Sequence, residues 1–177
     1  MERPVTLAAP PVTIRRIRPS DAAALERFYE ALSDDSRRTR FFALTRGLRA
    51  GQSAAFCATD HAHREGFVAL VHDEFAGRRI VGHLCLEPAG DGTAEMAVAV
   101  ADELQGRGIG RRLLDAGVAW ARSTGVTRMT ATMLATNGAI DRLVASLGLP
   151  TTRRATELDV IGIEVDLGPA AVAPRAA

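Results

Sequence analysis

Lysine is absent from this 177-residue chain, and its other chemically distinctive residues are few. All 22 basic residues are arginines, and 21 acidic residues nearly balance them, so the formal net charge is +1. Surfaces that bind nucleic acid carry a clustered excess of positive charge. We therefore expect no nucleic-acid partner.

Cysteine and long apolar runs are also scarce. Cys57 and Cys85 are too few for a disulfide framework and lack metal-ligand spacing, so we expect two reduced, buried thiols. Each apolar run is shorter than the about 18 residues of a membrane-spanning helix, which predicts no membrane partner. The N-terminal stretch lacks a cationic region followed by an apolar segment, so we expect no signal peptide and a cytoplasmic location.

Length and patterning favour one domain. A chain of this size suits a single core, and 47% hydrophobic and 24% charged residues are ordinary for a globular protein. Regular patterns run from residue 12 to residue 167. Prolines and small residues dominate 1–11 and 168–177, so both ends are predicted to be flexible tails.

The hydrophobic periodicity predicts a mixed α/β fold (α+β, with helices flanking a mixed sheet). Ser20 and Ser33 are the expected N-caps of the first two helices. The predicted strands are 12–17, 66–75, 79–88, 93–100 and 126–134, with a final strand over 155–167 or two strands broken at Gly162; the predicted helices are 22–32, 34–44, 109–123 and 137–147.

Three glycines lie two apart between the strand 93–100 and the helix that follows, in Gln105-Gly-Arg-Gly-Ile-Gly110. A dinucleotide fingerprint needs a glycine where Arg111 stands, and a Walker A loop needs a lysine. Glycine N–H groups beside a helix N-terminus still suit a phosphate, with Arg107, Arg111 and Arg112 as counter-charges. The alternative is a simple glycine turn before a helix.

This stretch resembles the acyl-coenzyme A signature Q/R-x-x-G-x-G/A of the GCN5-related N-acetyltransferases (GNATs). A second segment is similar too: Asn137 ends a strand, a helix follows, and Gly148-Leu149 replaces the family's Gly-Phe. The resemblance covers 12–167. It implies the GNAT acyl-CoA N-acyltransferase fold with a central, mostly antiparallel sheet, acetyl-CoA as cosubstrate without a metal, an amine acceptor, and the homodimer that family members often form.

Acetyl transfer to an amine needs a base, because a lysine-type amine has a pKa near 10.4 and arrives protonated. Alternation places Glu95 on one strand face with Ala97 and Ala99, and the larger Met96 and Val98 on the other. Small neighbours leave room for a ligand beside Glu95, our candidate base. The matching glutamate serves as base in the lysine-acetylating members that the chain resembles, although a solvated strand-edge glutamate is the alternative.

The resemblance also implies which residues hold the cosubstrate. Backbone groups of the strand end contact pantetheine, and one N–H polarises the thioester carbonyl. Asn137 hydrogen-bonds the pantetheine arm, caps its helix, or does both. The predicted cosubstrate-binding set is Val98, Ala99, Val100, Gln105, Gly106, Arg107, Gly108, Ile109, Gly110, Arg111 and Asn137.

The acceptor and the general acid are less defined by sequence. Val144 occupies the position at which many GNATs carry a catalytic tyrosine, and the chain's one tyrosine, Tyr29, is expected in the core. Residues 17–42 resemble the acetyltransferase domain of bacterial protein-lysine acetyltransferases, which implies a protein lysine as acceptor. A small-molecule amine acetyltransferase and a non-catalytic acyl-CoA-binding regulatory module are the alternatives.

The remaining polar residues favour structural roles. His61 and His63 could form a metal pair but lack a third ligand at a suitable spacing, so a loop role is expected, and His83 is expected in the core or at its rim. Charges alternate along 34–40, which favours a solvated, salt-bridged helix face. An acidic pair that meets a cationic acceptor is the alternative for Asp34 and Asp35.

Overall fold

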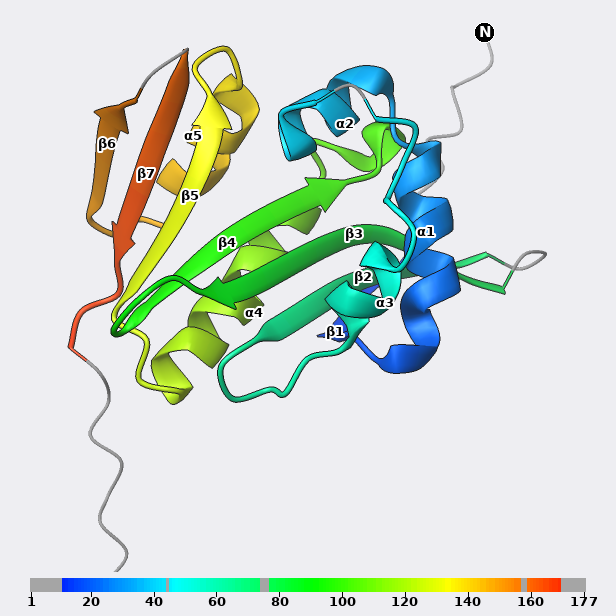
Figure 1. Ribbon diagram of the computed structural model, residues 1–177, viewed down its shortest axis with the longest axis horizontal. Helices are drawn as coiled ribbons and strands as arrows, with labels where there is room; N and C mark the ends of the chain where they lie inside the picture. Colours follow the sequence, from blue (N-terminus) through cyan, green and yellow to red (C-terminus); the bar gives the residue numbers. More distant parts are fainter. Residues whose placement is uncertain (1–10, 44, 74–76, 157–158, 170–177) are drawn as a thin grey trace, which may run out of the picture.

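The computed structural model describes residues 11–43, 45–73, 77–156 and 159–169, and within them a seven-stranded sheet in the order β1-β2-β3-β4-β5-β7-β6 (Figure 1). Neighbouring strands are antiparallel except β4 and β5, which are parallel. The strands are β1 (Val12–Arg16), β2 (Glu65–Asp73), β3 (Gly77–Pro88), β4 (Thr93–Val100), β5 (Arg128–Leu134), β6 (Thr151–Ala155) and β7 (Val160–Asp166). The helices are η1 (Pro19–Asp21), α1 (Ala22–Ala31), α2 (Asp34–Phe41), α3 (Gln52–Cys57), η2 (Asp102–Leu104), α4 (Ile109–Ser123) and α5 (Gly138–Ala145).

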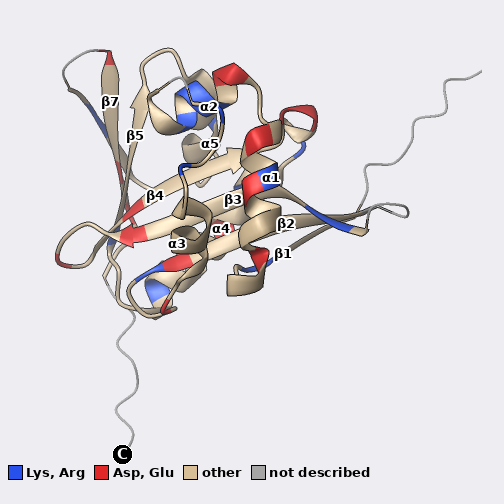
Figure 2. Cartoon of the chain, turned by 45° about the vertical axis from the view of Figure 1, so that its right-hand side comes forward, with Lys and Arg blue, Asp and Glu red and all other residues tan. Residues whose placement is uncertain are grey.

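Helices cover both faces of the larger half of the sheet. Helix α4 packs on β1 to β4, and Leu84 and Leu86 of β3 press against its Gly117. Helices α1 and α3 lie on the opposite face, where Tyr29 meets His83 of β3 (Figures 1 and 2). The predicted mixed sheet with flanking helices is confirmed.

Strand β4 changes partner halfway along its length. It pairs with β3 from Ala94 to Val100 but with β5 only from Thr93 to Glu95. Beyond Glu95 the two parallel strands diverge (Figure 1), so one edge of β4 has no neighbouring strand within the part of the chain that the structure describes. That open edge positions the site described below.

Strand β4 and helix α4 begin and end at the predicted residues. In α4 the apolar stripe is buried as expected: Ile109, Leu113 and Trp120 are each at most 3% exposed, and Ala116 packs partly buried against the core. Among the described residues, no helix is long and apolar enough to cross a membrane.

Several predicted boundaries near the N-terminus are wrong. Ser20 is not an N-cap, because 19–21 forms a 3₁₀ turn in which the Asp21 carboxylate accepts the Arg18 N–H and two bonds from Arg15. Ser33 does cap α2, but that helix ends at Phe41. The predicted continuation to Leu44 reaches a residue outside the described ones, as the predicted extension of β2 over 74–75 also does.

The C-terminal prediction also differs from the structure. The segment 155–167 is neither one strand nor two strands broken at Gly162, because Gly162 lies inside β7, paired with Thr132 on one side and Arg154 on the other. Strand β6 precedes it as a separate edge strand. The short elements α3 and η2 were not predicted.

We predict that Leu113→Ala destabilises the protein by about 2–5 kcal/mol, the range for a cavity left by a fully buried leucine. Leu113 is 0% exposed and contacts Gly82 of β3. Chemical denaturation measures the loss, and Ala119→Ser on the exposed face of the same helix should cost about 0.5 kcal/mol or less. A similar loss in both variants would contradict this account of the core.

Candidate active site

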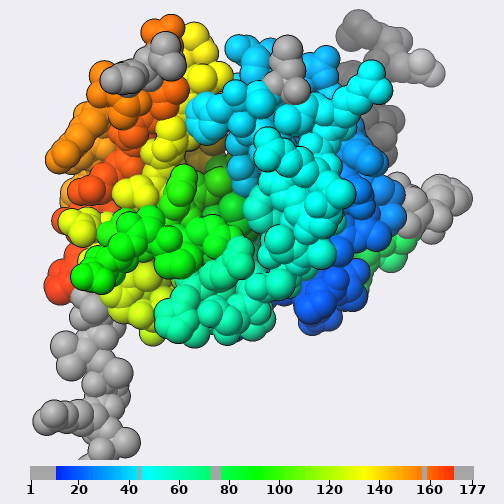
Figure 3. All heavy atoms as spheres, in the orientation of Figure 1, coloured from blue at the N-terminus to red at the C-terminus, as the bar shows by residue number. Residues whose placement is uncertain are grey.

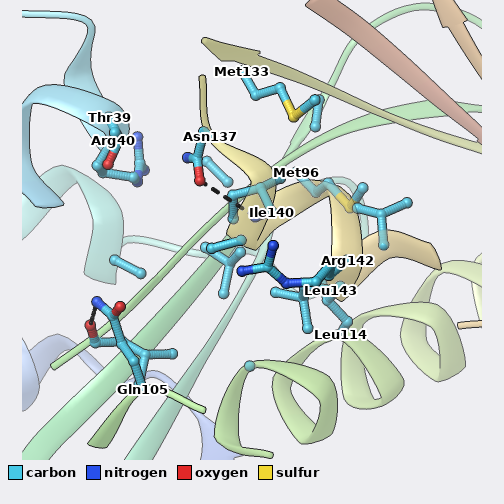
Figure 4. A pocket seen from close by; sticks show the side chains of 18 of the residues that line it. Thr39, Arg40, Met96, Gln105, Leu114, Met133, Asn137, Ile140, Arg142 and Leu143 are labelled. Atoms are coloured by element: carbon cyan, nitrogen blue, oxygen red, sulfur yellow. Dashed lines mark hydrogen bonds between the residues drawn. The ribbon is translucent and has the colours of Figure 1, made fainter. Parts of the chain in front are cut away.

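A cleft of about 710 Å³ opens along the free edge of β4 (Figures 3 and 4). Helix α2 forms one wall, β5 and α5 form the other, and the loop before α4 closes one end. The space-filling view shows the surface hollowed between α2 and the yellow β5–α5 segment, above green β4. The predicted site residues that line it are Glu95, Val98, Ala99, Val100, Gln105, Gly106, Gly108, Ile109, Gly110, Arg111 and Asn137, whereas Arg107 does not.

The Glu95 side chain is exposed at the cleft. The register between β3 and β4 is continuous, so Glu95, Ala97 and Ala99 share the face that alternation predicts. Glu87 lies directly opposite on β3 and is ion-paired with Arg64 at 2.7 Å. Among the described residues, no cation lies within 4.0 Å of the Glu95 carboxylate, which therefore remains available for a ligand.

The backbone of β4 offers hydrogen-bonding groups to the cleft at alternate residues. The Ala101 N–H donates to the Val81 carbonyl on β3 at 2.9 Å. In an antiparallel ladder the pattern repeats every second residue, so Ala99 also faces β3, and the N–H and C=O of Val98 face the open edge. Val98 is therefore the better backbone ligand, and a backbone role for Ala99 conflicts with its pairing to β3.

The three glycines have two different roles. Gly106 and Gly108 have φ of +70° and +80°, in the left-handed region that favours glycine, and a Cβ at either would meet open space. Gly108 is the N-cap residue of α4. At Gly110, by contrast, a Cβ would lie 3.0 Å from Leu143 Cδ2, so this glycine allows α5 to approach α4.

The arginines around the loop are arranged differently from the prediction. Arg111 lines the cleft, but its guanidinium binds Asp115 at 2.8 Å and the Ser146 carbonyl. Arg112 is turned away and donates to the Val12 carbonyl of β1 at 2.9 Å, so it does not supply counter-charge to the cleft. Arg142 of α5 does project into the cleft (Figure 4), and no motif in the sequence marks it.

Asn137 and Gln105 both have structural hydrogen bonds. The Asn137 Oδ1 accepts the Ile140 N–H at 3.3 Å, which confirms the N-cap role while the residue also lines the cleft. The Gln105 Nε2 donates to the Val100 carbonyl at 3.1 Å and to Ser36 Oγ at 3.2 Å. Gln105 thus fixes the loop against the end of β4.

Helix α2 is attached to the same loop through Asp102. The Asp102 carboxylate accepts the N–H and the hydroxyl of Ser33, each at 2.8 Å, and the Ser36 hydroxyl at 2.6 Å. Because Ser36 in turn accepts from Gln105, one network joins α2, η2 and the glycine loop. The α2 wall and the loop that closes this end of the cleft are therefore held in a fixed relation.

The charged helix α2 has two faces rather than one. Asp34 pairs with Arg37, and Asp35 with Arg38, which confirms the predicted salt bridges, although the Arg37 side chain is only 12% exposed and is not solvated as predicted. Arg40 does not belong to it. Its side chain lines the cleft and reaches inward to Cys85.

The other polar residues have local partners. His61 Nδ1 lies 2.9 Å from Glu65 and His63 Nδ1 lies 3.1 Å from Asp60 in the loop before β2. His83 is buried and hydrogen-bonded to Tyr29, as expected for a core histidine. Val144, at the position of the family tyrosine, lines the cleft as a buried apolar residue. Cys57 and Cys85 are free and buried, as predicted.

Comparisons with known proteins agree with this geometry. Residues 24–148 match the Acetyltransferase (GNAT) family. The GNAT domain of S. lividans PAT superposes with a TM-score of 0.77 at 30% identity, covering 88% of this chain and 90% of that one. The yncA acetyltransferase from Salmonella typhimurium, solved with acetyl-CoA, gives 0.69 at 25% identity, covering 94% and 99%.

Curated relatives agree as well. The acetyltransferase PA5475 of Pseudomonas aeruginosa is 28% identical over 77% of this chain and 74% of its own. The acetyltransferase Pat of Mycolicibacterium smegmatis is 38% identical over 81 residues, which are 46% of this chain and only 24% of that protein. With most of its length matched by the family and its sheet superposed on solved members, the chain belongs to the GNAT family of acetyltransferases.

Proposed function

We propose that residues 12–167 form one acetyltransferase domain that transfers the acetyl group of acetyl-CoA to a primary amine, with a protein lysine side chain as the favoured acceptor. The observation that carries the proposal is the open edge of β4. Its unpaired backbone groups run from the glycine loop toward Glu95 within one cleft.

The cleft offers a place for the pyrophosphate of acetyl-CoA at the glycine loop and a place for the pantetheine arm along β4. The pyrophosphate would meet the left-handed glycines and the N-terminus of α4, where free N–H groups and the helix dipole favour an anion. Arg142 adds positive charge on the α5 side. The pantetheine arm would lie along β4 and pair with Val98, with Asn137 across the cleft.

Glu95 would act as the general base. It takes a proton from the acceptor ammonium, directly or through water, and the neutral nitrogen then attacks the thioester carbonyl carbon. The C–N bond forms, the C–S bond breaks and the electron pair leaves with sulfur, while the nitrogen loses its second proton through water to the thiolate. A thiol is a good leaving group, with a pKa of about 8.5 for the cysteine side chain, so water can carry a proton to the leaving thiolate without a tyrosine at Val144.

Two observations support a protein lysine as acceptor. Residues 17–42 resemble the bacterial protein-lysine acetyltransferases, and the whole domain superposes on the GNAT domain of S. lividans PAT. The cleft also has an exposed aromatic rim, because Phe42 is 45% exposed next to α2. Exposed aromatic side chains are enriched where proteins meet. A cytoplasmic location and a homodimer remain predictions.

Two alternative functions use the same cleft. A small-molecule amine would use the same base, since acceptor sites in α/β enzymes vary with loops and short helices. A regulatory module that binds acyl-CoA without turnover would fit the absence of the family tyrosine at Val144.

We predict that acetyl-CoA is consumed faster with acyl-CoA synthetase proteins than with free polyamines, amino acids or aminoglycosides at equal amine concentration. Thiol release and mass spectrometry of the acceptor measure this. A faster reaction with a free amine would contradict the protein-lysine proposal and favour a small-molecule acceptor. Tight acyl-CoA binding without turnover of any amine would favour the regulatory module.

We predict that Glu95→Gln lowers the acetylation rate at neutral pH by about 10²–10⁴-fold, the usual contribution of a general base, while acetyl-CoA affinity is kept. Single-turnover kinetics and calorimetry separate the two effects. Glu87→Gln is the matched control, because Glu87 lies opposite on β3 but is paired with Arg64. Unchanged turnover in Glu95→Gln would exclude this residue as the base.

We predict that Gly108→Ala weakens coenzyme A binding much more than pantetheine binding, because only coenzyme A has the pyrophosphate. Gly125→Ala is the control, since Gly125 has φ of +82° and open surroundings at the other end of α4. Both variants should lose about 1–2 kcal/mol of stability through left-handed strain. Equal effects on coenzyme A and pantetheine would contradict a pyrophosphate site at this loop.

A further inference from the structure

Arg40 is a partly buried cation in the wall of the cleft (Figure 4). Its guanidinium carbon lies 5.0 Å from the centre of the Phe41 ring and 5.8 Å from that of Phe56, and one nitrogen donates to Cys85 Sγ at 3.3 Å. Its Nε is buried and has no hydrogen-bond partner among the described residues, as is also the case for the Nε of Arg15, Arg37 and Arg64, but each of those three guanidinium groups has a carboxylate partner. Within the ranges that the structure describes, no carboxylate lies within 4.0 Å of the Arg40 guanidinium.

The titratable groups around Arg40 are neutral at physiological pH. Burial raises the pKa of the Tyr29 phenol to about 12 and raises the pKa of the Cys85 thiol, although the charge of Arg40 opposes both shifts. Burial and the charge of Arg40 lower the pKa of His83 to about 3. The neighbours therefore supply dipoles and ring faces but no counter-charge.

A cation that is desolvated in this way is costly to keep without a counter-ion. The other arginines of α2 avoid the cost through a counter-ion, since Arg37, whose side chain is 12% exposed, pairs with Asp34, and the more exposed Arg38 pairs with Asp35. We infer that Arg40 is an anion-binding subsite of the acceptor arm of the cleft, so that the acceptor carries a carboxylate in addition to its amine. The inference rests on the proposed acetyltransferase function and narrows its substrate class.

Arg40 lies away from the place where the phosphates of coenzyme A would bind, so the anion that it would bind belongs to the acceptor. Cys85 is paired with Ala97 of β4, on the face that also carries Glu95. Two residues of strand span about 7 Å, so the proposed base and the guanidinium flank one small surface over Ala97. The glycine loop, where the phosphates would bind, lies beyond the end of β4. An acceptor that carries both an amine and a carboxylate could place its amine at Glu95 and its carboxylate at Arg40.

Two sources supply this chemistry: the carboxylate of a free amino acid, and an acidic side chain beside a lysine in a protein. Figure 2 shows both basic and acidic residues on α2 and an acidic residue near the start of β4. Both sources require a guanidinium that is charged and directed at the acceptor. They differ only in whether the carboxylate arrives with a free molecule or with a peptide.

The test compares acceptors that differ only in the carboxylate. Lysine and cadaverine form the free pair, and blocked Asp-Lys and Asn-Lys peptides form the peptide pair. For the pair that matches the true source, we expect kcat/KM to be about 10–100-fold higher for the carboxylate-bearing member, as for a hydrogen bond to a buried charged group. Calorimetric binding of the same four compounds to the protein–coenzyme A complex gives a readout that needs no turnover.

Arg40→Met keeps the length of the side chain and should abolish the preference in both readouts, while Arg40→Lys should keep part of it. Arg38→Met, on the solvent face of the same helix, should leave the preference unchanged. Thermal melting checks that each variant folds. A role in folding alone would lower the rates with both members of a pair and leave their ratio unchanged.

Equal rates and affinities within both pairs, or a preference that survives in Arg40→Met, would overturn the anion subsite. Acetylation without any carboxylate preference would leave the acetyltransferase proposal standing. A carboxylate preference in binding without turnover of any acceptor would instead support the subsite and remove the enzymatic proposal.

Discussion

The separation of β4 from β5 is the constraint on which the rest of the site depends. Backbone N–H and C=O groups need partners, and inside a sheet the next strand supplies them. Beyond Glu95 the β5 partner is missing, so β4 keeps β3 on one side and presents Val98 to the cleft on the other. A ligand that runs along this edge can make strand-like hydrogen bonds that the sheet itself leaves open.

The other elements around the cleft keep this opening in place. Asp102 and Gln105 fix α2 and the glycine loop to the end of β4, while Gly110 allows α5 to pack closely on α4. The walls therefore hold their separation without a strand between them. Such preorganisation suits a reaction in which a long cosubstrate and an amine must meet at one point.

How much the sequence could predict depended on how local each signal was. Strand β4 and helix α4 were predicted to their bounds because alternation and an apolar stripe are local patterns. The two roles of the glycines could not be separated, because the need at Gly110 arises from Leu143, which is distant in sequence. Gly162 was misjudged as a break for the same reason: pairing on both sides outweighs its weak strand propensity.

The lack of an acidic partner for Arg40 can be read from the sequence only once the helical spacing of α2 is known. On α2 each of the two aspartates has an arginine three residues later, whereas the residues three and four positions before Arg40 are arginine and serine. The alternation of charge along 34–40 hid this difference. The guanidinium without a counter-ion and the open edge of β4 have related physical meanings. Arg40 lacks a counter-ion and the edge of β4 lacks a strand partner among the described residues, and together they favour a ligand as the missing partner.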